Sequence, residues 1–158
     1  MKLNPLSEVR FRAKLAERYL KEAERAYRME DHKTAVGASQ LSVENAAKAV
    51  IAIYRIPSWS HDPSHELEEL TAAMPEEVKH LSRELAVIAR RLAPEHGRTT
   101  YGEPSRGLTP WDLYNREDAY SALNDARKAF KCLNEILEIH SKSKGLADPD
   151  GRPLEPSV

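Results

Sequence analysis

The sequence predicts an all-α protein, an antiparallel up-and-down four-helix bundle with a short extra helix. Three observations support this fold class. Apolar residues recur every three or four positions over long stretches, four segments begin with residues typical of helix N-termini, and no segment shows the alternation of a β-strand. At 158 residues the chain suits one domain and can bury a core without disulfides or a structural metal.

The first predicted helix runs from Pro5 to about Met29. Asn4 is a favourable N-cap, and Pro5 suits the first helical position, where no N–H is needed. Apolar residues then recur at helical spacing: Phe11, Leu15, Tyr19 and Ala23. At about 1.5 Å per residue this helix is roughly 37 Å long, which is the length of a bundle helix.

The second predicted helix follows at once, from His32 to about Arg55, with Asp31 as its N-cap. It carries two apolar stripes rich in alanine, so we expect a central helix that neighbours approach closely from two sides. Glu44 and Lys48 lie one turn apart and interrupt this surface. We expect them to form an ion pair with a structural role.

The next segment is predicted as two helices. Asp62 and Pro63 repeat the N-cap-plus-proline signal and start a short helix that extends to about Met74. Pro75 then restarts the helix as a second one. Pro94 ends the second of these helices. Its apolar residues alternate at three- and four-residue steps, as in a coiled coil: Val78, Leu81, Leu85, Ile88 and Leu92.

Residues 94–115 are predicted as a long loop, because three prolines and three glycines lie within these 22 residues. A single capped turn at residues 109–112 fits inside it. Loops longer than about 12–15 residues in compact domains are usually functional or disordered. This one is rich in rings and guanidinium groups: Arg98, Tyr101, Arg106, Trp111 and Tyr114.

The last predicted helix begins after Asn115, and its apolar seam runs from Ala119 through Leu133 to His140. Gly145 is a natural residue to follow its C-terminus. The sequence therefore divides into a helical-bundle domain, residues 1–144, and a C-terminal tail, residues 145–158, whose three prolines predict flexibility.

Composition narrows the class of protein. A single cysteine, Cys132, excludes an intrachain disulfide framework and fits a reducing compartment. No apolar run approaches the roughly 20 residues of a membrane span, and no secretory signal is evident, so we expect a cytoplasmic protein without membrane association. The net charge is −1, but residues 62–77 hold six acids and no lysine or arginine, whereas residues 79–116 carry a net charge of +3. This basic stretch is either solvated surface or a phosphate-contacting patch.

Sequence motifs for phosphate-binding loops and nucleophile elbows are absent. His61 and His65 lie four residues apart beside Asp62 and Glu66, but no third ligand is evident. No metal and no cofactor is therefore predicted.

Arg91 and His96 form the most informative pair, an Arg-x4-His spacing at the junction of a helix and the long loop. An imidazole can take a proton from a 2′-hydroxyl, and a guanidinium can stabilise charge on a phosphate, which together suffice for RNA cleavage without metal. The other interpretation is an exposed arginine at a helix end and an unrelated loop histidine, and the spacing alone leaves both open.

Over roughly residues 5–142 the chain resembles the HEPN (higher eukaryotes and prokaryotes nucleotide-binding) superfamily. The segments that carry the resemblance are residues 16–23 (AERYLKEA), 40–49 (QLSVENAAKA), 65–67 (HEL), 92–96 (LAPEH) and 98–104 (RTTYGEP). It implies a helical bundle, commonly a homodimer, that binds nucleotide or RNA. It also implies a small nucleotidyltransferase as partner, in a toxin–antitoxin-like pair.

Many members of this superfamily are ribonucleases with an Arg-x4–6-His motif composed across the dimer, and Arg91 and His96 match its spacing and position. Leu92 and Pro94 depart from the usual pattern around the motif. Other branches lack the nuclease motif, and Arg98 with Tyr101 resembles their Arg-Tyr-Pro element.

We therefore expect a binding module for nucleotide or RNA, in which arginines contact phosphate and rings stack on bases. The residues expected to contact the ligand are Arg90, Arg98, Tyr101 and Trp111. One alternative is a metal-independent ribonuclease toxin with Arg91 and His96 as catalytic residues. The other is a purely structural bundle for dimerisation or as an adaptor.

Overall fold

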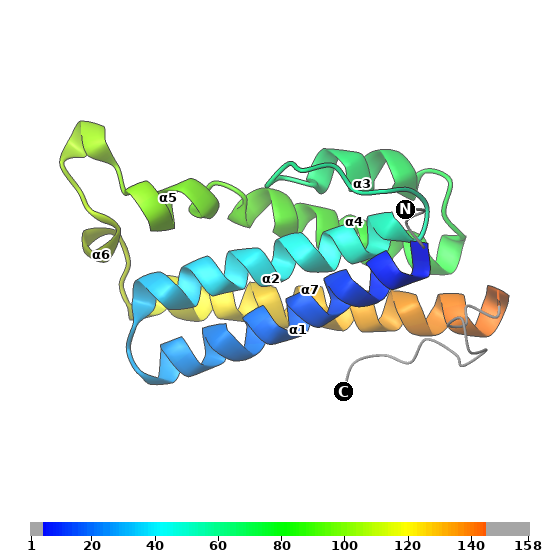
Figure 1. The fold of residues 1–158 in the computed structure, drawn as a ribbon, viewed down its shortest axis with the longest axis horizontal. Helices are drawn as coiled ribbons and strands as arrows, with labels where there is room; N and C mark the ends of the chain where they lie inside the picture. Colours follow the sequence, from blue (N-terminus) through cyan, green and yellow to red (C-terminus); the bar gives the residue numbers. More distant parts are fainter. Residues whose placement is uncertain (1–4, 145–158) are drawn as a thin grey trace.

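The computed structural model describes residues 5–144, and within this range every regular element is a helix (Figure 1). The predicted all-α bundle is confirmed. The elements are α1 (Pro5–Arg28), α2 (His32–Ala52), α3 (Ser64–Thr71), α4 (Glu76–Leu92), α5 (Glu95–Tyr101), the 3-10 turn η1 (Pro104–Arg106), α6 (Pro110–Leu113) and α7 (Arg116–Lys144). None of the helices in this range is long and apolar enough to cross a bilayer.

The bundle is built around α2, which packs against α1, α7 and α4. Helices α1 and α2 form an antiparallel hairpin, and α7 runs along the length of both (Figure 1). Sixteen of the 21 residues of α2 are buried, and many of them are alanine. Small side chains let the neighbouring helices approach closely, so the predicted central helix is confirmed.

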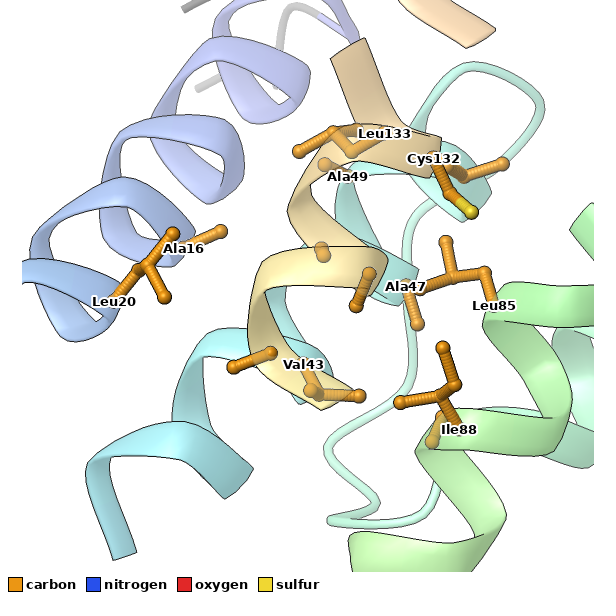
Figure 2. Close-up of a cluster of buried hydrophobic side chains, with 14 of the residues drawn as sticks. Ala16, Leu20, Val43, Ala47, Ala49, Leu85, Ile88, Cys132 and Leu133 are labelled. Atoms are coloured by element: carbon orange, nitrogen blue, oxygen red, sulfur yellow. The ribbon is translucent and has the colours of Figure 1, made fainter. Parts of the chain in front are cut away.

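The core is apolar and continuous across the bundle. Leu85 and Ile88 of α4 lie toward Ala47 of α2 and Cys132 of α7, as Figure 2 shows. The predicted apolar seam of α4 is buried throughout, from Val78 to Leu92. Burial also raises the pKa of the Cys132 thiol to about 12, which leaves it protonated and unreactive at neutral pH.

Two helix starts follow the predicted capping chemistry. Asp31 accepts a hydrogen bond from the backbone N–H of Thr34 at 3.2 Å. Before α7, the side chains of Asn115 and Asp118 cap each other's backbone N–H groups at 2.9 and 3.0 Å. Asn4 and Gly145, which were predicted to cap α1 and to follow α7, lie outside the described residues.

Some boundaries differ from the predictions by a few residues. Helix α2 ends at Ala52 rather than near Arg55, and α3 ends at Thr71 rather than near Met74. The N-cap position of α3 is Pro63, while Asp62 accepts a hydrogen bond from the backbone N–H of Ser64 at 3.1 Å.

The prediction of a long loop at residues 94–115 is wrong, because this segment forms α5, η1 and α6. Its prolines stand at helix starts, where a missing N–H leaves no hydrogen bond unmade. Gly102 and Gly107 end two of these elements with φ of +71° and +68°. The predicted turn at residues 109–112 is confirmed as α6, which begins with a capping box between Thr109 and Asp112. The segment projects at the end of the bundle where α1 turns into α2 (Figure 1).

Candidate functional site

A line of polar side chains interrupts the apolar surface of α2. Gln40, Glu44 and Lys48 follow one another at one-turn intervals and are only 2%, 6% and 3% exposed. Glu44 accepts hydrogen bonds from Gln40 Nε2 at 3.1 Å on Oε1 and from Lys48 Nζ at 3.3 Å on Oε2. The predicted Glu44–Lys48 ion pair is therefore confirmed, and pairing is what allows two charges to be buried.

Two histidines from other parts of the chain complete this line. His61 lies between α2 and α3, and its Nδ1 is 3.1 Å from Glu44 Oε1. His96 lies in the first turn of α5, and its Nδ1 is 3.2 Å from Gln40 Oε1. The two imidazole rings stack, with centroids 3.6 Å apart and planes inclined by 18°. We call Gln40, Glu44, Lys48, His61 and His96 the histidine cluster.

The hydrogen bonds of the cluster fix the tautomer of both imidazoles. A carboxylate accepts but does not donate, so Gln40 directs its NH2 group to Glu44 and its carbonyl oxygen to His96. The Nδ1 of His96 therefore carries a hydrogen and donates it. His61 Nδ1 donates to Glu44 in the same way. In the neutral form of each ring, Nε2 keeps its lone pair.

The partner of His61 is not the one that sequence spacing suggested. His65 is 81% exposed at its side chain and lies 3.4 Å from Glu69. Glu44 and His96 approach His61 instead, from α2 and α5. The available signal was the spacing of Gln40, Glu44 and Lys48, long polar side chains four residues apart on a helix whose other buried residues are mostly small or apolar.

A second site, the arginine cleft, lies where α4, α5, α6 and α7 meet. It is a cleft of about 220 Å³ whose lining includes Arg91, Arg98, Glu95, Tyr114 and Asp125. The Nε and Nη2 atoms of Arg91 donate to both carboxylate oxygens of Asp125 at 2.9 and 2.7 Å. This hydrogen bonding raises the pKa of Arg91.

Arg98 is held on the other side of the arginine cleft. Its Nη1 donates to Glu95 at 2.7 Å and its Nη2 to Glu103 at 2.9 Å. The hydroxyl of Tyr114 also donates to Glu95, and burial together with this carboxylate raises the pKa of Tyr114.

The predicted basic stretch is largely neutralised within the fold. Two arginines and three carboxylates, Asp118 among them, line the arginine cleft. Outside it, Arg90 pairs with Glu68 at 2.8 Å and Arg106 pairs with Glu103 at 2.6 Å. A phosphate would therefore meet guanidinium groups that already have carboxylate partners.

The two predicted rings are exposed. Tyr101 at the end of α5 is 76% exposed, and Trp111 in α6 is 73% exposed. Lys33, at the start of α2, places its Nζ 5.0 Å from the centroid of the Trp111 ring. Both rings are thus on the segment that projects from the bundle.

Arg91 and His96 have separate partners within one chain. Arg91 binds Asp125 of α7, whereas His96 binds Gln40 of α2, and among the described residues no hydrogen bond joins the pair. Glu95 and His96 are neighbours in sequence, yet Glu95 belongs to the arginine cleft and His96 to the histidine cluster. Helix α5 therefore contributes to both sites.

Comparisons with known proteins bear on the whole fold. A family model described as the HEPN domain matches residues 9–139. The crystal structure of TT1696 from Thermus thermophilus superposes with a TM-score of 0.62 at 23% sequence identity, over 81% of this chain and 97% of that chain. At this identity the likeness concerns the fold alone. A search of curated proteins found no match.

Proposed function

The chain belongs to the HEPN domain family, and on that premise we propose that it binds a nucleotide or a short RNA at the arginine cleft. The observation that supports this proposal best is the fixed guanidinium of Arg91. Its side chain remains 53% exposed although it is held by Asp125, of which only 11% is exposed.

Arg91 keeps hydrogen-bond donors for a ligand. A guanidinium has five N–H donors, and Asp125 takes one from Nε and one from Nη2. The fork also holds the side chain still, so that little rotamer entropy is left to lose when a phosphate binds. Arg98 lines the same cleft and supplies a second guanidinium.

Two exposed aromatic rings can stack on the base of a nucleotide. Tyr101 and Trp111 present aromatic faces on the projecting α5–α6 segment, and stacking of a base on such a ring contributes about 1–3 kcal/mol. The carboxylates of the arginine cleft oppose a phosphate, so we expect weak binding with few phosphate contacts and a correspondingly shallow dependence on salt.

Binding is tested by anisotropy of labelled single-stranded RNA and by calorimetry with ATP at low salt. The double variant Arg91→Ala/Asp125→Ala removes the ion pair without leaving one charge behind, and we expect it to weaken binding at least about 10-fold. Trp111→Ala should weaken binding of RNA by about 1–3 kcal/mol. Arg127→Ala is the matched control, since Arg127 pairs with Glu24 of α1 on another side of α7 and should bind as the natural chain does.

Absence of binding by the natural chain at low salt would contradict the proposal and favour a structural dimerisation or adaptor bundle. Equal losses in Arg127→Ala and in the double variant would instead indicate a general charge effect.

A second candidate function is metal-independent RNA cleavage, and the tautomer of His96 favours it. Gln40 holds the Nδ1 hydrogen, so Nε2 can accept a proton from a 2′-hydroxyl. Because Arg91 and His96 face different partners in one chain, we propose that the two residues meet across a dimer. Cleavage of RNA in EDTA should be lost in His96→Ala and kept in His65→Ala, and cleavage retained by His96→Ala would exclude this role.

Family membership also supports two partner proposals. We propose a homodimer, which light scattering of the full chain tests and a monomer would contradict. We propose a small nucleotidyltransferase as the partner of a toxin–antitoxin-like pair, tested by co-purification after co-expression and by relief of growth inhibition. A cytoplasmic location stays a prediction.

A further inference from the structure

We propose that Glu44, His61 and His96 bind a divalent transition-metal ion, with zinc as the best fit. Each of the three offers one donor atom, and these atoms all lie within 4.8 Å of one another. The inference goes beyond the proposed binding of nucleotide or RNA and does not depend on it.

The set of donors selects the class of metal. Two imidazole nitrogens and one carboxylate oxygen suit zinc and its first-row neighbours, whereas magnesium and calcium prefer oxygen ligands throughout. Three protein ligands leave one position of a tetrahedral ion open, as in zinc sites that also bind water or a substrate.

The separation of the donor atoms fits a shared ion. His61 Nδ1 lies 3.1 Å from Glu44 Oε1. Ligand atoms bound tetrahedrally to one zinc at about 2.0–2.2 Å lie about 3.3–3.6 Å from each other, so this pair is slightly closer than zinc requires. An ion that replaces the Nδ1 hydrogen of His61 can therefore bind both atoms with little movement of either side chain.

The stack of the two imidazoles brings both nitrogen ligands close to Glu44. The lone pairs of nearly parallel rings lie in separate planes, however, so an ion bound by both requires one ring to turn out of the stack. The rings lie 3.6 Å apart and nearly parallel, and among the described residues no hydrogen bond joins them. Glu44 and Gln40, one turn apart on α2, hold one ring each. The result is that two nitrogen ligands from distant segments are kept side by side over a buried carboxylate.

Lys48 and Gln40 orient the carboxylate toward the histidines. Lys48 donates to Oε2 of Glu44, so Oε1 is the oxygen that faces His61. Such outer partners commonly fix the geometry of a metal ligand. His61 is 57% exposed at its side chain, so an ion reaches the cluster from solvent and water can complete its coordination.

The test is titration of the untagged, chelator-treated full chain with zinc chloride by calorimetry. We expect one ion per chain, and cobalt(II) in its place should give the intense visible absorption of a four-coordinate site. His61→Ala should weaken zinc binding at least about 10-fold. His65→Ala is the matched control, because His65 is an exposed histidine four residues away, and it should bind zinc normally.

Each outcome decides the proposal. Absence of zinc binding, equal losses in His61→Ala and His65→Ala, or undiminished binding by His61→Ala would overturn it. In chains whose circular dichroism shows the natural fold, Glu44→Gln should weaken zinc binding, and undiminished binding would overturn the proposal. If that variant does not fold, His96→Ala with His61→Ala decides. Because the zinc titration contains no RNA or nucleotide, and the binding assays for RNA and ATP contain no zinc, failure of this inference and failure of the proposed function are distinguishable.

Discussion

The arginine cleft and the histidine cluster are both held by ion pairs, but the two pairs differ in their access to water. Lys48 and Glu44 in the histidine cluster have side chains that are 4% and 7% exposed, whereas Arg91 in the arginine cleft is 53% exposed. If Arg91 loses its partner, its charge can be hydrated by solvent. If Lys48 loses its partner, its charge stays buried without water. Similar contacts therefore carry different energies in the two sites.

The largest expected effect on stability comes from removal of the acidic partner of an ion pair. Glu44→Ala leaves the ammonium of Lys48 buried without a carboxylate, which should lower the free energy of unfolding by about 3–5 kcal/mol. Asp125→Ala leaves Arg91 in contact with water, and the expected loss is about 0–1 kcal/mol. Urea denaturation of both variants measures the difference, and equal losses would contradict the comparison.

A double variant separates the burial of charge from loss of packing. Glu44→Leu with Lys48→Met replaces the buried pair by apolar side chains of similar size, and it should regain most of the stability lost in Glu44→Ala. If the double variant is as unstable as Glu44→Ala, the loss comes from packing rather than from the unpaired ammonium.

The second prediction concerns α5, which contributes to both sites and is ended by Gly102. A Cβ at Gly102, whose φ is +71°, would lie 2.2 Å from the carbonyl oxygen of Leu108, so Gly102→Ala should destabilise the segment by about 1–3 kcal/mol. Gly97 lies within α5, and apart from the adjoining residues and the backbone of that helix no atom lies within 4 Å of such a Cβ, so Gly97→Ala should stabilise α5 by about 0.5–1 kcal/mol. Hydrogen exchange of the α5 amides should change in opposite directions, and changes of the same sign would contradict this account.

The helices and their buried faces could be predicted because apolar residues recur in the sequence with the period of a helix. The seam of α4 and the stripes of α2 are regular enough to show which faces are buried. The polar sites are only partly visible in this way. Gln40 and Lys48 lie one turn from Glu44 on α2, but the third partner of Glu44, His61, comes from outside that helix. Prolines and glycines in residues 94–115 indicate where regular structure is interrupted, but they do not indicate whether loops or short helices lie between them. Arg91 and Arg98 were predicted as cations, and their carboxylate partners on α5, α7 and the η1 segment depended on the fold.

The smallest expected effect is the pH response of the exposed rim of the arginine cleft. Hydrogen bonds from Arg106 and then Arg98 lower the pKa of Glu103 below its usual 4.5. Glu103 therefore stabilises the fold at pH values above the pKa of its carboxyl in the unfolded chain. This stabilisation is lost as the pH falls through the lower pKa that the carboxyl has in the folded chain. Carbon NMR of the Glu103 carboxyl should give a midpoint below 4.5, and Arg106→Ala should raise it. A midpoint at or above 4.5 in the natural chain would contradict this assignment.

The buried thiol of Cys132 also gives the chain a practical property. The sequence has one cysteine, and burial raises its pKa to about 12, so we expect little thiolate at neutral pH to attack a maleimide dye. Trp111→Cys would thus carry a fluorophore at one defined surface position without removal of the native cysteine. Energy transfer between differently labelled copies could then report how the projecting segments of two chains are spaced.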